Sequence, residues 1–180
     1  RLIVVATVPI ALTGWLFADL VEWLRRPSVA AVALALGAGV MLAAERVGSR
    51  RRTTASLSLI EAVGLGCAQA AALVPGVSRS GAVITVAMLT GLTREEAARF
   101  TFLLGIPAIL GAGVRTAWML GEGGVAAPVS LLLVGFLASG VVGYLAIAGL
   151  LRYIARNSLD LFAYYRLVVA AALGLWLVAA

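Results

Sequence analysis

Histidine and lysine are absent from this chain of 180 residues, and cysteine occurs once, at Cys67. Without histidine the chain cannot form a Ser-His-Asp triad, and it lacks the residue that most often shuttles protons or binds metals. A lone cysteine forms neither an internal disulfide nor a cysteine-based zinc site, so we interpret Cys67 as a small apolar packing residue.

Charged residues are also scarce: they make up 12% of the chain, against 63% hydrophobic residues, and the mean hydropathy is +1.08. Soluble domains carry about 25% charged and about 45–50% apolar residues. A water-soluble fold of this size has too little interior to bury so much apolar surface. The apolar runs recur along the whole sequence, so they are not one signal peptide on a soluble domain. The composition predicts an integral membrane protein.

The net charge is +6, and arginine is the only basic residue type. Most arginines lie in short segments between apolar runs and form no contiguous basic face, so we expect no nucleic-acid partner. Their distribution predicts topology, because basic loops stay on the cytoplasmic side of a membrane. The side predicted to be cytoplasmic carries Arg1, Arg46, Arg50, Arg51, Arg52, Arg94, Arg99, Arg152 and Arg156. The opposite side, where the C-terminus is expected, carries Arg25, Arg26 and Arg115.

Apolar runs of about 20 residues, the length that crosses a bilayer as a helix, divide the chain. They predict a single transmembrane domain, residues 1–180, of the all-α class: a polytopic membrane helix bundle. The predicted spans are residues 2–24, 29–45, 100–119, 129–151 and 162–179.

The segment 58–92 has a different pattern. Its two apolar arms, 59–74 and 82–89, are too short or too polar for ordinary spans, and they meet at a cluster of Pro, Gly and Ser residues that includes an Arg. We interpret it as a re-entrant helix hairpin that turns inside the membrane, where irregular backbone is tolerated only beside protein or a water-filled cavity. A single kinked helix is the alternative.

Ser78, Arg79, Ser80 and Gly81 stand immediately before the second arm. A helix start offers unpaired backbone N–H groups and the positive end of the helix dipole, and serine is a common cap there. Capping does not explain Arg79, because a guanidinium near the bilayer centre costs at least about 2.5–3.5 kcal/mol. Arginine makes planar, two-pronged contacts with phosphate, so the turn predicts a pocket for a phosphate-like anion. The alternative is a structural ion pair between Arg79 and Glu61.

Polar and small residues around this turn have two interpretations each. Gly76, together with Pro75, breaks the first arm, and Gly81 permits close backbone approach. Thr85 directs its hydroxyl either to the pocket or to its own helix backbone. Gln69 carries an amide that needs a partner, so it either lines the pocket or ties two helices together.

Four stretches of the chain resemble a known family, the undecaprenyl-diphosphate phosphatases, also called bacitracin-resistance proteins. They are residues 61–69, 72–81, 97–108 and 162–166. The family signature is Pro-Gly-x-Ser-Arg-Ser-Gly followed shortly by Thr, and residues 75–81 match it, as does Thr85. The resemblance runs from end to end of the chain, and its central motif is specific.

The resemblance implies a multi-pass hydrolase of the bacterial inner membrane. Such an enzyme converts undecaprenyl diphosphate to undecaprenyl phosphate and phosphate, recycles the lipid carrier for peptidoglycan synthesis and confers bacitracin resistance. Its partners would be the membrane, a polyprenyl diphosphate lipid and, as one option, a second copy in a homodimer. The family is built from two inverted repeats, each with a re-entrant hairpin, and this chain resembles the second. The rival hypothesis is a transporter or lipid flippase without hydrolysis. A diphosphate site needs the Ser-Arg-Ser turn, whereas an ordinary drug exporter does not.

One section of the family pattern has no counterpart here. The family carries an N-terminal Glu/Gln-x-x-x-Glu motif and a Ser-rich turn ending in Gly-His, and nothing in this sequence matches them. We therefore expect a chain that is incomplete at its N-terminus, inactive by itself, and without the nucleophile and the general base.

The residue roles follow from the same resemblance. It implies Arg79 and Ser78 as catalytic residues. It implies that the substrate diphosphate is bound by Ser80, Gly81, Thr85, Gly76 and Gln69. Mg²⁺ or Ca²⁺ would bridge the diphosphate oxygens, with no side chain of this chain as a predicted metal ligand and no organic cofactor.

Overall fold

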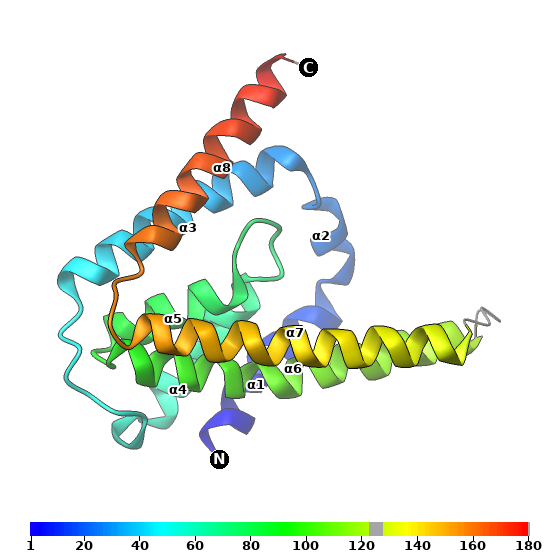
Figure 1. Cartoon of the computed structure of the whole chain (residues 1–180), viewed down its shortest axis with the longest axis horizontal. Coiled ribbons are helices and arrows are strands. Elements are labelled where there is room, and N and C mark those ends of the chain that lie inside the picture. The colour runs from blue at the N-terminus through cyan, green and yellow to red at the C-terminus, as the bar shows by residue number, and fades with distance from the viewer. Residues whose placement is uncertain (123–127, 180) are drawn as a thin grey trace.

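The structure is a computed structural model that describes residues 1–122 and 128–179, and these residues form helices and their connections (Figure 1). The helices are α1 (Leu2–Leu16), α2 (Ala18–Trp23), α3 (Pro27–Val47), the 3₁₀ turn η1 (Thr54–Ser56), α4 (Leu59–Ala71), α5 (Arg79–Leu89), α6 (Arg94–Glu122), α7 (Val129–Ile154) and α8 (Asp160–Ala179). Within these ranges the sole β-type pairing is an isolated bridge between Arg52 and Leu92. The predicted all-α class is confirmed.

Four helices of this part of the chain, α3, α6, α7 and α8, are long and apolar enough to cross a membrane. In α7 only Ile154 is buried, and Figure 1 shows the C-terminal part of α6 and the N-terminal part of α7 extending beyond the other helices. Such exposed apolar faces are expected where lipid is the solvent. The helices therefore form the predicted polytopic membrane bundle.

The predicted span 2–24 is divided into α1 and α2, and the break lies at Phe17, whose φ is −119° and ψ 28°. Helix α1, with 15 residues, is shorter than a typical span. It packs closely along α4: a Cβ on Gly66 would lie 2.2 Å from the Ala6 carbonyl oxygen, and one on Gly14 would lie 4.0 Å from Leu73 Cδ1. Because α4 ends at Ala71, α1 has no further helix of the hairpin to follow, and the chain bends soon afterwards.

The segment 58–92 forms two helices, α4 and α5, joined by residues 72–78, and not a single kinked helix. Helix α4 begins with a capping box in which Glu61 N–H donates to Ser58 Oγ (3.2 Å) and Ser58 N–H donates to Glu61 Oε2 (2.8 Å). The two arms pack on each other, α4 also contacts α1, and α5 also contacts α3 and α6. The depth of this hairpin in a membrane and its inverted-repeat relationship stay predictions.

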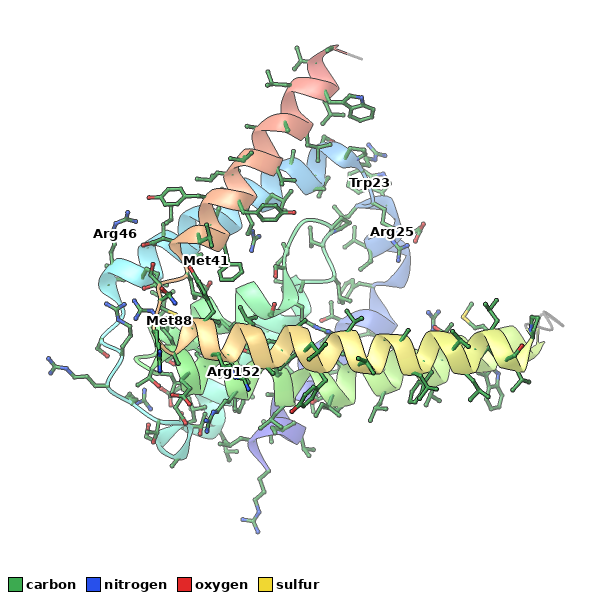
Figure 2. All side chains as sticks on the ribbon, in the orientation of Figure 1. Trp23, Arg25, Met41, Arg46, Met88 and Arg152 are labelled. Carbon is green, nitrogen blue, oxygen red and sulfur yellow. The ribbon has the colours of Figure 1, made fainter. Side chains whose placement is uncertain are left out.

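A buried carboxylate joins three helix ends at one side of the bundle. Glu45, at the end of α3, accepts hydrogen bonds from Arg50 Nη1 (2.9 Å), Arg94 Nε (2.9 Å) and the Leu159 backbone N–H (2.8 Å). These contacts fix the loop after α3, the start of α6 and the connection between α7 and α8 to one another. Figure 2 shows Arg46 at this side and Arg25 at the opposite one, while the side of the membrane on which each group lies stays a prediction.

Candidate functional site

The turn between α4 and α5 is held directly against the backbone of α3. Gly76 has φ +88°, a left-handed conformation that favours glycine. A Cβ on Gly76 would lie 2.3 Å from the Ala30 carbonyl oxygen, so even alanine could not fit without movement of α3. In Figure 1 this turn is the loop that projects into the space beside α2 and α3. The predicted substrate-binding residue Gly76 thus sets the position of the turn.

Helix α5 begins with free hydrogen-bond donors. Ser78 is its N-cap, and the Ser78 Oγ accepts a hydrogen bond from the Gly81 backbone N–H at 3.1 Å. The hydroxyl oxygens of Ser78 and Ser80 are 3.5 Å apart. The backbone N–H groups of Arg79 and Ser80 occupy the first two helical positions, where no intrahelical acceptor exists, and they have no other acceptor in the described chain. Two hydroxyls and two N–H groups at a helix N-terminus can bind an anion.

A second arginine, Arg166 of α8, is buried beside this helix start with only 6% of its surface exposed. Its Nη2 donates to the Gly76 carbonyl oxygen at 3.2 Å, while its Nε is buried with no hydrogen-bond partner. No carboxylate among the described residues forms an ion pair with it. Two glycines make room for the guanidinium, because a Cβ on Gly37 would lie 2.3 Å from Nη2 and one on Gly81 2.8 Å from Nη1.

Two cavities meet at Arg166, and both are lined by Val77, Gly81 and Arg166. The larger has a volume of about 390 Å³ and lies between α3, α5, the end of α7 and α8. Its further lining residues are Leu34, Met41, Gly76, Ser78, Ser80, Ile84, Leu150, Ile154, Leu159, Phe162 and Tyr165. The smaller, of about 190 Å³, lies between α3, α4 and α5, and its further lining residues are Gly37, Val40, Ala68, Ala71, Ala82, Thr85 and Val86. Ser78 and Ser80 therefore face one cavity and Thr85 the other.

Arg79 lies on a different side of the turn from these cavities and lines neither of them. Its side chain is exposed and reaches α6, where Nη2 is 4.0 Å from the position that a Cβ would take on Gly105. It has no ion pair or hydrogen bond from its guanidinium in residues 1–122 and 128–179. The cation of the predicted motif is thus available to a ligand.

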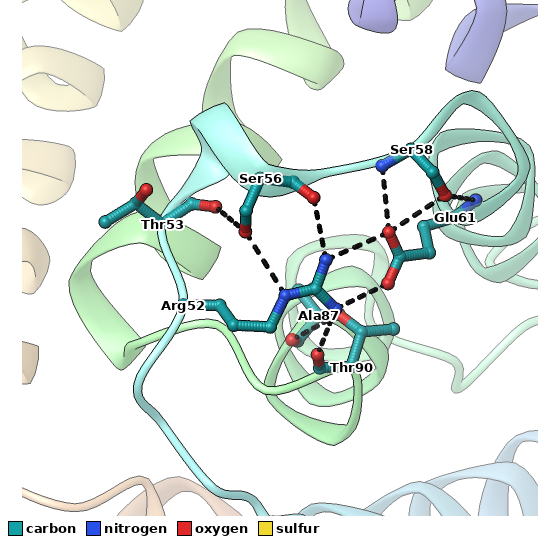
Figure 3. Close-up of polar contacts among 7 residues, drawn as sticks. All are labelled: Arg52, Thr53, Ser56, Ser58, Glu61, Ala87 and Thr90. Atoms are coloured by element: carbon teal, nitrogen blue, oxygen red, sulfur yellow. Dashed lines mark hydrogen bonds and ion pairs between the residues drawn. The ribbon is translucent and has the colours of Figure 1, made fainter.

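The alternative interpretation, an ion pair between Arg79 and Glu61, is wrong. Glu61 pairs with Arg52, whose Nη1 lies 2.6 Å from Glu61 Oε1 and whose Nη2 lies 3.1 Å from Oε2 (Figure 3). Arg52 also donates to the Thr90 carbonyl oxygen at the end of α5, so this cluster ties the two ends of the hairpin together. The Arg52 guanidinium and the Ser58 cap lower the pKa of the Glu61 carboxyl to about 2.

The structure places the Thr85 side chain at a cavity and the Gln69 side chain away from both cavities. Thr85 is buried, lines the smaller cavity and makes no hydrogen bond to its own helix within the described residues, whereas Thr90 and Thr101 do. This arrangement favours the pocket alternative for its hydroxyl. Gln69 is fully buried in α4, lines neither cavity, and neither amide atom has a hydrogen-bond partner there. The structure does not bring Gln69 to the helix start, so its diphosphate-binding role stays a prediction.

Arg166 is the site residue that sequence reasoning missed. The signal was present, because an arginine inside an apolar span is expensive and usually has a functional reason. It falls in the fourth stretch of family resemblance, 162–166, yet the predicted site stopped at the turn and its immediate neighbours. Only the packing of α8 on α3 brings residue 166 to residue 76.

The residues at this site do not fit the ligand set of a divalent cation. Mg²⁺ and Ca²⁺ prefer carboxylate and carbonyl oxygens, and neither cavity has a carboxylate in its lining. The described part of the chain has no cluster of three or more His, Cys, Asp or Glu side chains that could hold a metal. The charge at the site is positive, which suits an anion.

Residues 1–172 match the family described as bacitracin resistance protein BacA. The undecaprenyl-diphosphatase of Rubrobacter xylanophilus is 51% identical over 172 residues, which cover 94% of this chain and 63% of that protein. The undecaprenyl-diphosphatase of Corynebacterium glutamicum is 41% identical over 169 residues (92% and 58%), and that of Gloeobacter violaceus is 40% identical over 175 residues (95% and 60%). The chain spans about three fifths of the length of these relatives. With its four membrane-spanning helices and this match along nearly its whole length, the chain is a multi-pass membrane protein that belongs to the bacitracin resistance protein family.

Proposed function

We propose that this chain carries the phosphate-binding residues of an integral membrane phosphatase that hydrolyses undecaprenyl diphosphate to undecaprenyl phosphate and phosphate. Its role would be to recycle the lipid carrier for peptidoglycan synthesis in the bacterial inner membrane and so to confer bacitracin resistance. The names of the relatives support the reaction. The observation that carries the proposal from the structure is the unpaired, buried Arg166 beside the free N–H groups and hydroxyls of the α5 start.

Burial of Arg166 without an ionic partner has a free-energy cost. A buried guanidinium without an ionic partner is strongly unfavourable, and a bound anion removes most of the penalty. Ser78 and Ser80 offer hydroxyls in the same cavity lining, and the helix dipole adds positive potential. A phosphate has both the charge and the several acceptor oxygens that such donors need.

Arg79 and Ser78 have the proposed catalytic roles. Phosphoryl transfer depends mainly on positioning and on stabilising charge over the transferring group. Arg79 is exposed and unpaired, so its two-pronged guanidinium can neutralise a phosphate in both the ground state and the transition state. Gly81 N–H is already bonded to Ser78 Oγ, and thus Gly81 contributes space for Arg166 rather than a free donor.

The base that activates water is proposed to lie in the part of the relatives that this chain does not match. A divalent cation, Mg²⁺ or Ca²⁺, is proposed to arrive bound to the diphosphate, since the side chains here offer no ligand set for it. Loss of phosphate release in the presence of a chelator would support that proposal, and unchanged release would contradict it. A homodimer is also proposed, to be tested by native mass spectrometry from detergent.

The rival hypothesis, a transporter or lipid flippase without hydrolysis, is less favoured. A transporter of uncharged cargo gains nothing from two unpaired arginines beside one helix start. A flippase for a lipid diphosphate would use them, so binding alone does not separate the two hypotheses. Measurement of phosphate release separates the two hypotheses.

The decisive experiment measures phosphate release from undecaprenyl diphosphate in detergent micelles. Two proteins are compared: this chain by itself, and a chimera in which it is joined to the unmatched part of the 51%-identical Rubrobacter relative. We expect turnover by the chimera and none by the chain alone. If the chimera folds and moves the lipid across vesicles but releases no phosphate, the phosphatase proposal is wrong. Robust turnover by the chain alone would show that no further segment is required.

A further inference from the structure

We propose that the two arginines divide the diphosphate between them, so that Arg166 binds the phosphate next to the lipid chain and Arg79 binds the terminal phosphate. The larger cavity would hold the first isoprenyl units of the chain beside Arg166. This inference rests on the proposed function for the identity of the substrate, but its binding test is independent of turnover.

The larger cavity has an amphipathic lining. Its polar groups, Ser78, Ser80 and Arg166, come from the start of α5 and from α8. The rest of the wall is mainly apolar, with Leu34 and Ile84 among its aliphatic residues. A volume of about 390 Å³ lies within the range of about 300–1,000 Å³ that is usual for sites of small organic ligands. The ligand that fits such a wall is an amphiphile with an anionic head and a hydrocarbon tail.

The Arg166 side chain is buried with its hydrogen-bonding capacity only partly used. It is 6% exposed, its Nε has no hydrogen-bond partner, and its remaining backbone contact is with the Gly76 carbonyl oxygen. The guanidinium therefore has an unused, buried donor at the wall of the larger cavity. A monoanionic or dianionic phosphate at the polar end of the cavity would satisfy this donor and balance the charge.

Arg79 lies apart from that cavity. Successive residues of an α-helix point about 100° apart, so the first turn of α5 presents its side chains to different sides. Ser78 and Ser80 line the larger cavity, whereas Arg79 between them lines neither cavity and extends toward Gly105 of α6. A diphosphate laid across the helix start would place one phosphate on each side. The lipid chain lies in the cavity, so the phosphate on the Arg79 side is the terminal one.

This division predicts which group leaves and which stays. The P–O bond that breaks joins the two phosphates, water supplies the new oxygen, and the terminal phosphate departs from the Arg79 side. The lipid monophosphate remains at Arg166. A lipid monophosphate should therefore bind without help from Arg79, whereas a lipid diphosphate should need both arginines.

The test is equilibrium binding of radiolabelled farnesyl monophosphate and farnesyl diphosphate to the purified chain in detergent micelles, with farnesol as the measure of partition into the micelle. We expect Arg166→Gln to weaken both phosphates about ten-fold or more, as the loss of one charge-assisted hydrogen bond implies. Arg79→Gln should weaken the diphosphate by about ten-fold but the monophosphate by less than about two-fold.

A matched pair on α3 tests the cavity itself. Leu34→Trp fills the larger cavity and should weaken both ligands about ten-fold, whereas Leu36→Trp, at a side chain that is 65% exposed, should not. Circular dichroism and size-exclusion profiles identify any variant that fails to fold. If Arg166→Gln fails to fold, the Leu34→Trp and Arg79→Gln variants still test the proposal.

Three results would overturn the inference. Equal binding of farnesol and farnesyl monophosphate would mean that no phosphate is recognised. Equal weakening of the monophosphate by Arg79→Gln and Arg166→Gln would mean that both arginines hold the same phosphate. Binding unchanged by Leu34→Trp would mean that the isoprenyl chain of the ligand does not occupy the larger cavity. Failure of the chimera to release phosphate would count against the proposed reaction, and these binding results would stand apart from it.

Discussion

Replacement of Glu45 by glutamine should destabilise the fold more than any other single loss of a carboxylate. The Glu45 side chain is 4% exposed and binds two arginines and one backbone N–H. Glutamine keeps the volume and one acceptor oxygen but removes the charge that balances Arg50 and Arg94. The three helix ends joined by this carboxylate would then be held by weaker, neutral hydrogen bonds.

The magnitude follows from the burial of the partners. Removal of one member of a buried ion pair costs about 3–5 kcal/mol, because the other charge stays desolvated. The Arg50 and Arg94 side chains are 32% and 29% exposed, so water relieves part of that penalty. We therefore expect about 3 kcal/mol for Glu45→Gln, near the low end of the range.

The assay is reversible unfolding in mixed micelles, with increasing sodium dodecyl sulfate and helix content followed by circular dichroism. The matched control is Glu95→Gln, which removes an exposed pair with Arg99 whose side chains are 48% and 60% exposed, and it should cost less than about 0.5 kcal/mol. A double replacement, Glu45→Leu with Arg94→Leu, should show a coupling energy of about 1–3 kcal/mol. Equal losses for Glu45→Gln and Glu95→Gln would refute the reasoning.

Three further predictions concern the hairpin. In the phosphate-releasing chimera, Arg79→Lys should cost about ten- to a hundred-fold in turnover for each charge-assisted bond lost, since lysine cannot form the planar fork; near-normal turnover would contradict a phosphate contact. Glu61 has a folded pKa of about 2, below its ordinary value of 4.5, so its stabilising effect is present above about pH 5 and is lost as the pH falls toward 2. Unfolding curves of Glu61→Gln should lack that acid dependence, and an unchanged dependence would assign it to another group. Gly76→Ala should destabilise the chain by more than about 1 kcal/mol, because φ is +88° and the methyl group would meet Ala30. The control in the same unfolding assay is Gly39→Ala on α3, where an added Cβ would have no atom within 4 Å.

The turn chemistry could be predicted from sequence because it depends on neighbours along the chain. Ser78 caps α5 as a serine before a helix should, and Pro75 and Gly76 lie in the connection between the arms, although α4 already ends at Ala71. The alternative of an ion pair between Arg79 and Glu61 is wrong because Glu61 pairs with another residue, and local sequence patterns do not reveal that partner. Its partner Arg52 comes from a loop that is placed by pairing with Gly91 and Thr93.

Helices long and apolar enough to cross a bilayer could be predicted from the sequence, whereas the helix break at Phe17 could not. Helices α3, α6, α7 and α8 follow the predicted apolar runs, since length and hydropathy suffice for a helix in a bilayer. The break at Phe17 has no Pro or Gly at that position to announce it. The helix along which α1 packs is α4, and α4 ends at Ala71, 54 residues after Phe17.

By itself, the sequence determined the membrane environment, the all-helical class, the family and the serine-capped start of α5, because these follow from composition and from residues that are neighbours along the chain. The tertiary structure alone decided which charges remain unpaired. Packing of α8 against α3 buries Arg166 beside Gly76 and Gly81, and the Arg52 cluster removes Glu61 from reach of Arg79. Electrostatic partners are set by distance in space, and distances between segments arise only when the helices pack.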